Sequence, residues 1–213
     1  LCDRRQRQMC IRDRMKQGEL YTADELLKKA LRYKGYWGSK GGITVSGGEP
    51  LLQMDFLTEF FKKAKAEGVH TNLDTSGNPF TDQEPWHSGW LELMKYTDLV
   101  MLDIKQIDEQ EHIKLTGHSN KNILAMAREL SDMKKPVWIR HVLVPGGSDK
   151  DEYLHRLADF IHTLSNVERV EVLPYHTLGK FKWENLGLSY PLEGVNPPTQ
   201  ERIDNARKIL GAI

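Results

Sequence analysis

Cysteine is nearly absent from this 213-residue chain, in which it occurs only at Cys2 and Cys10. Two cysteines are too few for a disulfide framework, and no cluster of cysteine and histidine has the spacing of a metal site. The G-x-G-x-x-G and Walker A motifs are absent as well, so nucleotide binding through those loops is not supported.

Excess charge of one sign and long apolar runs are also lacking. The 30 basic residues balance the 30 acidic ones, which gives no electrostatic reason to expect a nucleic-acid or membrane partner. No apolar run approaches the roughly 20 residues of a membrane helix, and no apolar segment of a signal peptide opens the chain. We therefore expect a cytoplasmic protein, long enough for one domain with a real core.

What is present is a regular alternation of strand and helix patterns from Glu19 onward. Short apolar segments predict five strands, at 42–46, 70–75, 98–105, 136–145 and 167–175. Amphipathic segments predict helices that begin at Thr22 and Met54, and others around 90–95, 121–133, 149–164 and 198–210. The strands are mostly non-alternating, as in strands buried on both faces. The pattern is typical of a parallel α/β fold, either a barrel or an open sheet.

Glycines, polar residues or charged residues follow every predicted strand. Ligands of parallel α/β folds bind at the carboxyl ends of the strands, so these residues form the candidate site. They are Ser46-Gly47-Gly48-Glu49, Asp74-Thr75, Asp103-Ile104-Lys105, Arg140 and His141 with the following Val144-Pro145-Gly146-Gly147, and Pro174-Tyr175-His176. A purely structural barrel also places such residues on its rim, but the convergence of all five strand ends favours a ligand.

The residues of the first two strand ends each have a structural alternative. Gly47 and Gly48 either make a tight turn or let a ligand approach the backbone closely. Glu49 is favoured near a helix N-terminus by the helix dipole. Asp74 either caps a turn or holds a hydroxyl or ammonium group.

The later strand ends are open to the same choice. Asp103 and Lys105 are two residues apart on a strand and therefore share a face. The lysine then needs a counter-charge, which is either Asp103 or a ligand carboxylate. His176 is either a solvated surface residue or a contact of an aromatic ligand. Schiff-base chemistry at Lys105 is a weaker reading that nothing else in the sequence supports.

Four sequence segments carry a resemblance to a known family. TVSGGEPLLQMDFLTEFFKKAKAEGVHTNLDTSG (44–77) resembles radical S-adenosylmethionine (SAM) proteins. DLVMLDIKQ, VWIRHVLVPGGSD and VEVLPYHTLGKFKWENLG narrow the resemblance to the pyruvate formate-lyase activases, which generate glycyl radicals. The resemblance covers roughly residues 19–211. Its GGE element alone is shared by many radical SAM proteins, whereas the combination of the later segments is more specific.

The resemblance implies a partial (β/α)6 barrel that holds SAM and a 4Fe–4S cluster. The cluster cleaves SAM reductively, and the resulting 5′-deoxyadenosyl radical takes a hydrogen atom from a glycine of the protein substrate, pyruvate formate-lyase. A flavodoxin- or ferredoxin-type reductant and a monomeric activase are implied as well. Another glycyl-radical enzyme as substrate is the alternative within the same class.

The family's functional positions carry over to this chain motif by motif. The resemblance implies that Gly47, Gly48 and Glu49 hold the methionine ammonium end of SAM and that Lys105 faces its carboxylate. Lys105 and Arg140 are the implied catalytic residues. The implied cofactor-binding residues are Gly47, Gly48, Glu49, Asp74, Asp103, Ile104, Lys105 and His176.

The family's cluster motif, C-x-x-x-C-x-x-C, is missing from the chain. Thiolates are the ligands of such clusters, so we expect no metal ligands and no catalysis in this polypeptide as written. LCDRRQRQMCIRDR, at the N-terminus, resembles translated sequencing-adapter sequence. We therefore expect residues 1–14 to be non-native and residues 15–213 to be one barrel domain without its first βα unit, with an open strand edge. A genuine basic arm, and with it a non-catalytic binding module without a cluster, is the alternative.

Overall fold

Five parallel strands form one sheet in the part of the chain that the computed structural model describes, residues 19–38 and 41–212. The strands are β1 (Gly42–Val45), β2 (His70–Thr75), β3 (Leu99–Asp103), β4 (Val137–Leu143) and β5 (Val167–Pro174). Their order in the sheet follows their order in the chain. Each strand is parallel to its neighbours, which confirms the predicted α/β class.

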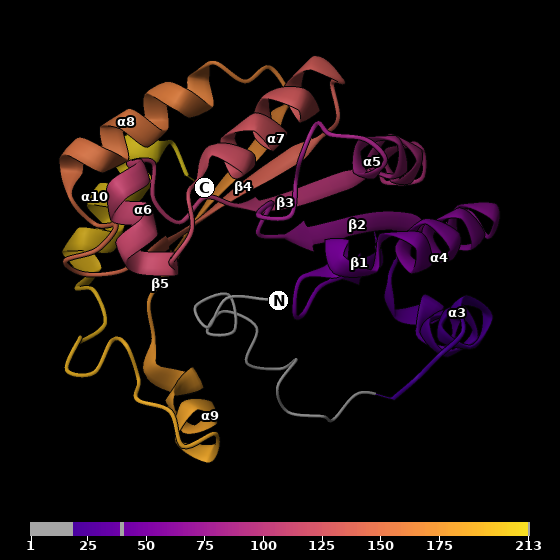
Figure 1. The fold of residues 1–213 in the computed structure, drawn as a ribbon, viewed down its shortest axis with the longest axis horizontal. Coiled ribbons are helices and arrows are strands. Elements are labelled where there is room, and N and C mark those ends of the chain that lie inside the picture. Colours follow the sequence, from indigo (N-terminus) through magenta and orange to yellow (C-terminus); the bar gives the residue numbers. More distant parts are fainter. Residues whose placement is uncertain (1–18, 39–40, 213) are drawn as a thin grey trace.

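Eight helices occur in the described part of the chain. They are α3 (Ala23–Leu31), α4 (Met54–Ala66), α5 (Trp86–Lys95), α6 (Glu109–Thr116), α7 (Lys121–Asp132), α8 (Asp151–His162), α9 (Lys180–Asn185) and α10 (Gln200–Leu210). Helices α4, α5, α7 and α8 lie along the outer side of the curved sheet (Figure 1). Short 3-10 turns occur at Lys34–Tyr36, Pro50–Gln53 and Thr177–Gly179.

The predicted elements agree with these bounds to within two residues at most ends, and β2 agrees at both. The expected capping box of α3 is present, because the Thr22 hydroxyl accepts from the Glu25 amide and the Glu25 carboxylate accepts from the Thr22 amide. Two helices were not predicted, α6 and α9. Helix α6 is capped by Asp108 and ends at Gly117, whose φ is 85°. The cap and the glycine are ordinary boundary signals, but the segment between them is only weakly apolar.

The prediction that the strands are buried on both faces is wrong for β4, whereas in β2 the consecutive residues Thr71, Asn72 and Leu73 are all buried. Along β4, buried and partly exposed residues alternate. Val137, Ile139 and Leu143 join the core beneath the helices, whereas Trp138 and Arg140 face the other way. In β4 the outer face therefore lies in the core and the inner face is partly exposed. Strand β5 adds Arg169 and Glu171 to this inner face, in register with Trp138 and Arg140.

The core lies between the outer face of the sheet and the helices. Helix α4 contributes Leu57, Phe60, Phe61 and Ala64, all of them nearly inaccessible, at the spacing of one helical face. This packing fixes the sheet, so that the carboxyl ends of all five strands lie at one edge.

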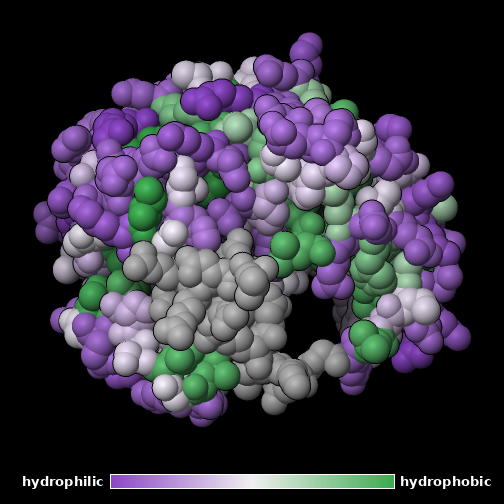
Figure 2. Space-filling model, in the orientation of Figure 1, coloured by the Kyte–Doolittle hydropathy of each residue, from purple (hydrophilic) through white to green (hydrophobic). Residues whose placement is uncertain are grey.

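The surface is mostly hydrophilic in the view of Figure 2, with hydrophobic residues over α9. Leu178, just before that helix, is 75% exposed, and Phe181, within it, is 53% exposed. Among the described residues, no helix combines the length and the apolar character needed to cross a membrane.

Candidate functional site

The turn after β1 needs both of its glycines. Gly47 has a φ of 86° and Gly48 a φ of 52°, in the left-handed region that residues with a Cβ rarely adopt. Two such residues in succession reverse the chain between β1 and the 3-10 turn that begins at Pro50. Gly47 is exposed and Gly48 partly exposed, so their backbone groups are accessible at the strand edge.

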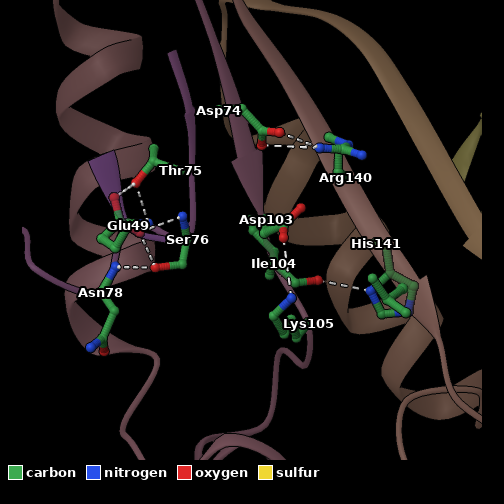
Figure 3. Close-up of polar contacts among 12 residues, drawn as sticks. Glu49, Asp74, Thr75, Ser76, Asn78, Asp103, Ile104, Lys105, Arg140 and His141 are labelled. Carbon is green, nitrogen blue, oxygen red and sulfur yellow. Dashed lines mark hydrogen bonds and ion pairs between the residues drawn. The ribbon is translucent and has the colours of Figure 1, made fainter. Parts of the chain in front are cut away.

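The Glu49 side chain ties this turn to the end of β2. Its Oε1 accepts from the Leu51 amide at 3.1 Å and from the Thr75 hydroxyl at 2.6 Å. Its Oε2 accepts from the amide and the hydroxyl of Ser76, at 2.9 and 2.5 Å. Both carboxylate oxygens are thus occupied by protein groups in a residue that is only 9% exposed (Figure 3). Any ammonium group held by Gly47-Gly48-Glu49, as predicted, would therefore meet backbone carbonyls rather than this carboxylate.

The inner face of β2 to β5 carries three carboxylates and three cations. Register places Asp103, Arg140 and Glu171 in one row across three strands. These six charged side chains are Asp74, Asp103, Lys105, Arg140, Arg169 and Glu171. Their charges balance, so the inner face is polar without an excess of either sign.

Asp74 and Arg140 meet across this face, although they come from strands that are not adjacent. Arg140 Nη1 donates to both oxygens of Asp74, at 3.0 and 2.9 Å (Figure 3). Burial nevertheless raises the pKa of Asp74 above its ordinary value, against the pull of Arg140, and the nearby Asp103 carboxylate raises it further.

Asp103 and Lys105 form the second pair, with Lys105 Nζ donating to Asp103 Oδ2 at 3.1 Å. This confirms that the two side chains share a face and that Asp103 supplies a counter-charge for the lysine. Both side chains are 21% exposed. The other carboxylate oxygen, Asp103 Oδ1, is buried and accepts no hydrogen bond from any described residue. An acceptor buried without a donor is costly, so a ligand that brings a donor would stabilise this arrangement.

The structure does not bring all of the predicted site residues together. His176 is exposed just after β5, at the start of the 3-10 turn Thr177–Gly179. No hydrogen bond or ion pair between described residues links it to the pairs on the inner face. The Ile104 side chain lies in the core, so a cofactor contact there would have to be made by its backbone.

Sequence reasoning missed several polar residues of the site. Ser76 binds the Glu49 carboxylate beside the predicted Thr75, and Arg169 and Glu171 extend the charged inner face to β5. A signal for the last two was available, because the segment VERVEVLP alternates polar and apolar residues from Arg169 onward. Such alternation indicates a strand with one polar face.

The inner face fits SAM, which carries an ammonium group, a sulfonium group and a carboxylate. Asp103 Oδ1 offers a buried acceptor that lacks a donor among the described residues, which suits an ammonium group. Lys105 offers an ammonium for the carboxylate. The donor set therefore agrees with the residues expected to bind SAM, whose individual roles remain predictions.

An iron–sulfur cluster does not fit the residues of this chain. The two cysteines, Cys2 and Cys10, both lie outside the described residues, as does the whole of segment 1–14. Within residues 19–38 and 41–212, no group of three or more His, Cys, Asp or Glu side chains could hold a metal ion. The family's requirement of three thiolates exceeds the number of cysteines in the sequence.

Comparison with known proteins agrees with this fold. The family profile described as Radical SAM superfamily matches residues 2–158. A pyruvate formate-lyase-activating enzyme of Streptococcus mutans is 57% identical over 189 residues, which are 89% of this chain and 72% of that protein. One from Staphylococcus epidermidis is 56% identical over 190 residues, covering 89% of this chain and 76% of the relative.

A solved structure gives the same result at the level of the fold. The crystal structure of a domain of pyruvate-formate lyase-activating enzyme from Bacteroides vulgatus superposes with a TM-score of 0.65 at 26% identity. The match covers 80% of this chain and 93% of that domain. The radical SAM family uses SAM and a 4Fe–4S cluster. The chain belongs to the radical SAM superfamily and, within it, to the pyruvate formate-lyase-activating enzymes.

Proposed function

We propose that this protein is the SAM-binding barrel of an activase that forms a glycyl radical in pyruvate formate-lyase. The observation that carries the proposal is the inner-face pair of Asp103 and Lys105, with the Asp103 Oδ1 atom left without a donor. In a radical SAM chain that is 57% identical to a pyruvate formate-lyase-activating enzyme, this pair stands where the amino-acid end of SAM is expected.

Each residue of the site has a role in the proposal. Lys105 binds the SAM carboxylate, and the backbone of Gly47-Gly48 receives the ammonium group. Arg140, held by Asp74, stands on the open inner face and orients the glycine-bearing segment of the protein substrate. His176, at the end of β5, borders the adenosine. Bound SAM supplies the radical chemistry in this family.

The polypeptide of 213 residues is proposed to be inactive by itself, because it has two cysteines and the family's cluster needs three thiolates. In the same proposal, residues 1–14 are not native and residues 15–213 form the barrel domain. A flavodoxin- or ferredoxin-type reductant, a cytoplasmic location and a monomeric state complete the proposal.

An electron paramagnetic resonance experiment tests this function. The chain is incubated anaerobically with iron, sulfide, SAM, reductant and pyruvate formate-lyase. The same is done with a variant in which a strand and loop bearing C-x-x-x-C-x-x-C replace residues 1–14. We expect the glycyl-radical signal only with the variant. A signal from the unchanged chain contradicts the proposed inactivity. A variant that binds its cluster and SAM yet gives no radical contradicts the choice of pyruvate formate-lyase as substrate. Other glycyl-radical enzymes would then be tested in the same assay.

The second candidate function is a binding module without a cluster, and the observation that favours it is the presence of only two cysteines. It predicts SAM binding by the unchanged chain and no gain of activity from the cysteine-bearing segment. The same experiment therefore separates the two functions.

A further inference from the structure

His141 lies on the outer face of β4, on the opposite side of the sheet from its neighbour Arg140. It is 2% exposed. Its Nδ1 lies 2.8 Å from the carbonyl oxygen of Ile104, and its Nε2 lies 3.3 Å from the carbonyl oxygen of Ser148. Neither the fold class nor the predicted cofactor contacts account for a histidine in this position.

The contact with Ile104 matters because of where Ile104 stands. It is the residue between Asp103 and Lys105, just beyond the end of β3. Its amide donates to the Arg140 carbonyl at 2.9 Å, and its own carbonyl contacts the His141 ring (Figure 3). Two consecutive residues of β4 therefore hold both backbone polar groups of the segment that carries the Asp103–Lys105 pair.

The distances assign the tautomer of His141. Burial lowers the pKa of this imidazole below its ordinary value of 6.5, so the ring is neutral at pH 7 and carries one N–H. The shorter contact, at 2.8 Å, places that hydrogen on Nδ1, which then donates to the Ile104 carbonyl. The Ser148 side chain has partners of its own, since its hydroxyl donates to the Val142 carbonyl at 2.6 Å and accepts from the Val144 amide at 2.9 Å.

We propose that His141 is a positioning residue of the SAM site, which it reaches from the far side of the sheet. Its Nδ1–H fixes the Ile104 carbonyl and thereby sets where the Asp103 carboxylate and the Lys105 ammonium stand on the inner face. Without that donor the buried carbonyl is left without a partner, and the segment that leaves the sheet shifts to find one. The inference rests on the proposed function only in naming SAM as the ligand.

Two substitutions separate the two ring nitrogens. In His141→Asn the amide nitrogen takes the place of Nδ1 and still donates to Ile104. In His141→Gln the longer side chain carries its amide toward the place of Nε2 and leaves the Ile104 carbonyl unpaired. Val137→Ala is the matched control, because Val137 is fully buried on the same face of the same strand but lies at its other end. It destabilises the fold without touching the site.

Two measurements on the full chain decide the matter. The first is the dissociation constant of SAM, measured by calorimetry for the wild type and the three variants, each checked for folding by circular dichroism. We expect His141→Gln to weaken binding about tenfold, the size of one lost hydrogen bond. His141→Asn and Val137→Ala should stay within about threefold of the wild type. The second is the ¹⁵N spectrum of the imidazoles, in which His141 should show the Nδ1–H form.

The contrary results are equally distinct. Equal SAM affinity of the His141→Gln and His141→Asn variants, or an Nε2–H tautomer in the wild type, overturns the role of His141. A wild-type chain that binds no SAM overturns the proposed function instead. The role of His141 is then decided by the tautomer together with hydrogen exchange at the Ile104 amide, which donates to the Arg140 carbonyl. That exchange should be faster in His141→Gln than in His141→Asn, and equal rates overturn it.

Discussion

Replacing Glu49 by glutamine tests whether this carboxylate holds the Gly47-Gly48 turn against the end of β2. Glu49 accepts four hydrogen bonds, two of them from hydroxyl groups and two from the backbone amides of Leu51 and Ser76. A glutamine side chain has one oxygen and one NH2 group. Whichever way it is oriented, one of the two amides then faces another donor.

The expected cost follows from this count. The hydroxyls of Thr75 and Ser76 can rotate to accept from an NH2 group, so their bonds survive in weaker form. One backbone amide loses a charged acceptor and is left without a partner, which costs about 2–4 kcal/mol. We therefore expect Glu49→Gln to lower the free energy of unfolding by that amount.

Urea unfolding followed by circular dichroism measures this change. Glu59→Gln serves as the control, because Glu59 is exposed on α4 and, among the described residues, makes only a long ion pair with Lys63, at 3.6 Å. It should change the free energy of unfolding by less than about 0.5 kcal/mol. If Glu49→Gln is as mild as the control, the carboxylate does not hold the turn, and the reasoning is refuted.

Three further predictions concern the turn after β1, the buried histidines and Lys135, which precedes β4. Gly48→Ala should destabilise the protein by about 1–2 kcal/mol because of its positive φ, whereas Gly35→Ala, where an added methyl meets nothing within 4 Å, should be neutral in the same urea assay. Burial lowers the pKa of both His112 and His141. The free energy of unfolding should therefore keep its full value above pH 6.5 and fall as the pH drops below it, by at most about 2.7 kcal/mol per pH unit for the two histidines together. A free energy of unfolding that does not change between pH 7 and 5.5 would contradict this. Lys135→Met should lower the free energy of unfolding by about 1–3 kcal/mol, since Lys135 Nζ donates to two backbone carbonyls, at 2.9 and 2.6 Å. An unchanged thermal unfolding temperature would show that these bonds contribute nothing.

The sequence was sufficient for the fold because local signals and the fold agree. Strand β2 was predicted at both ends, since its segment HTNLDT is followed directly by a turn signal, Ser76-Gly77-Asn78-Pro79. The two unpredicted helices lack a strong apolar period. In α6 the segment EQEHIKLT has only two large aliphatic residues, and α9 is six residues long.

From the sequence, only contacts within a single strand segment of the site could be predicted. Asp103 and Lys105 were expected to share a face because both lie on one segment, and they do. The pairing of Asp74 with Arg140 depends on how the three strands β2, β3 and β4 lie side by side, which no local pattern contains. The fully occupied carboxylate of Glu49 has the same origin, since its partners Thr75 and Ser76 stand 26 and 27 residues further along the chain.

Titration of the chain with SAM, in parallel with the variant Lys105→Met, tests most directly whether the inner face is the SAM site. Lys114→Met is the control, because Lys114 is exposed on α6 and pairs with Glu111. One saturable site in the wild type and the control, weakened about 10- to 100-fold in Lys105→Met, is the expected result for the loss of one charged hydrogen bond. Equal affinity of Lys105→Met and the wild type would place SAM elsewhere and contradict the site described above.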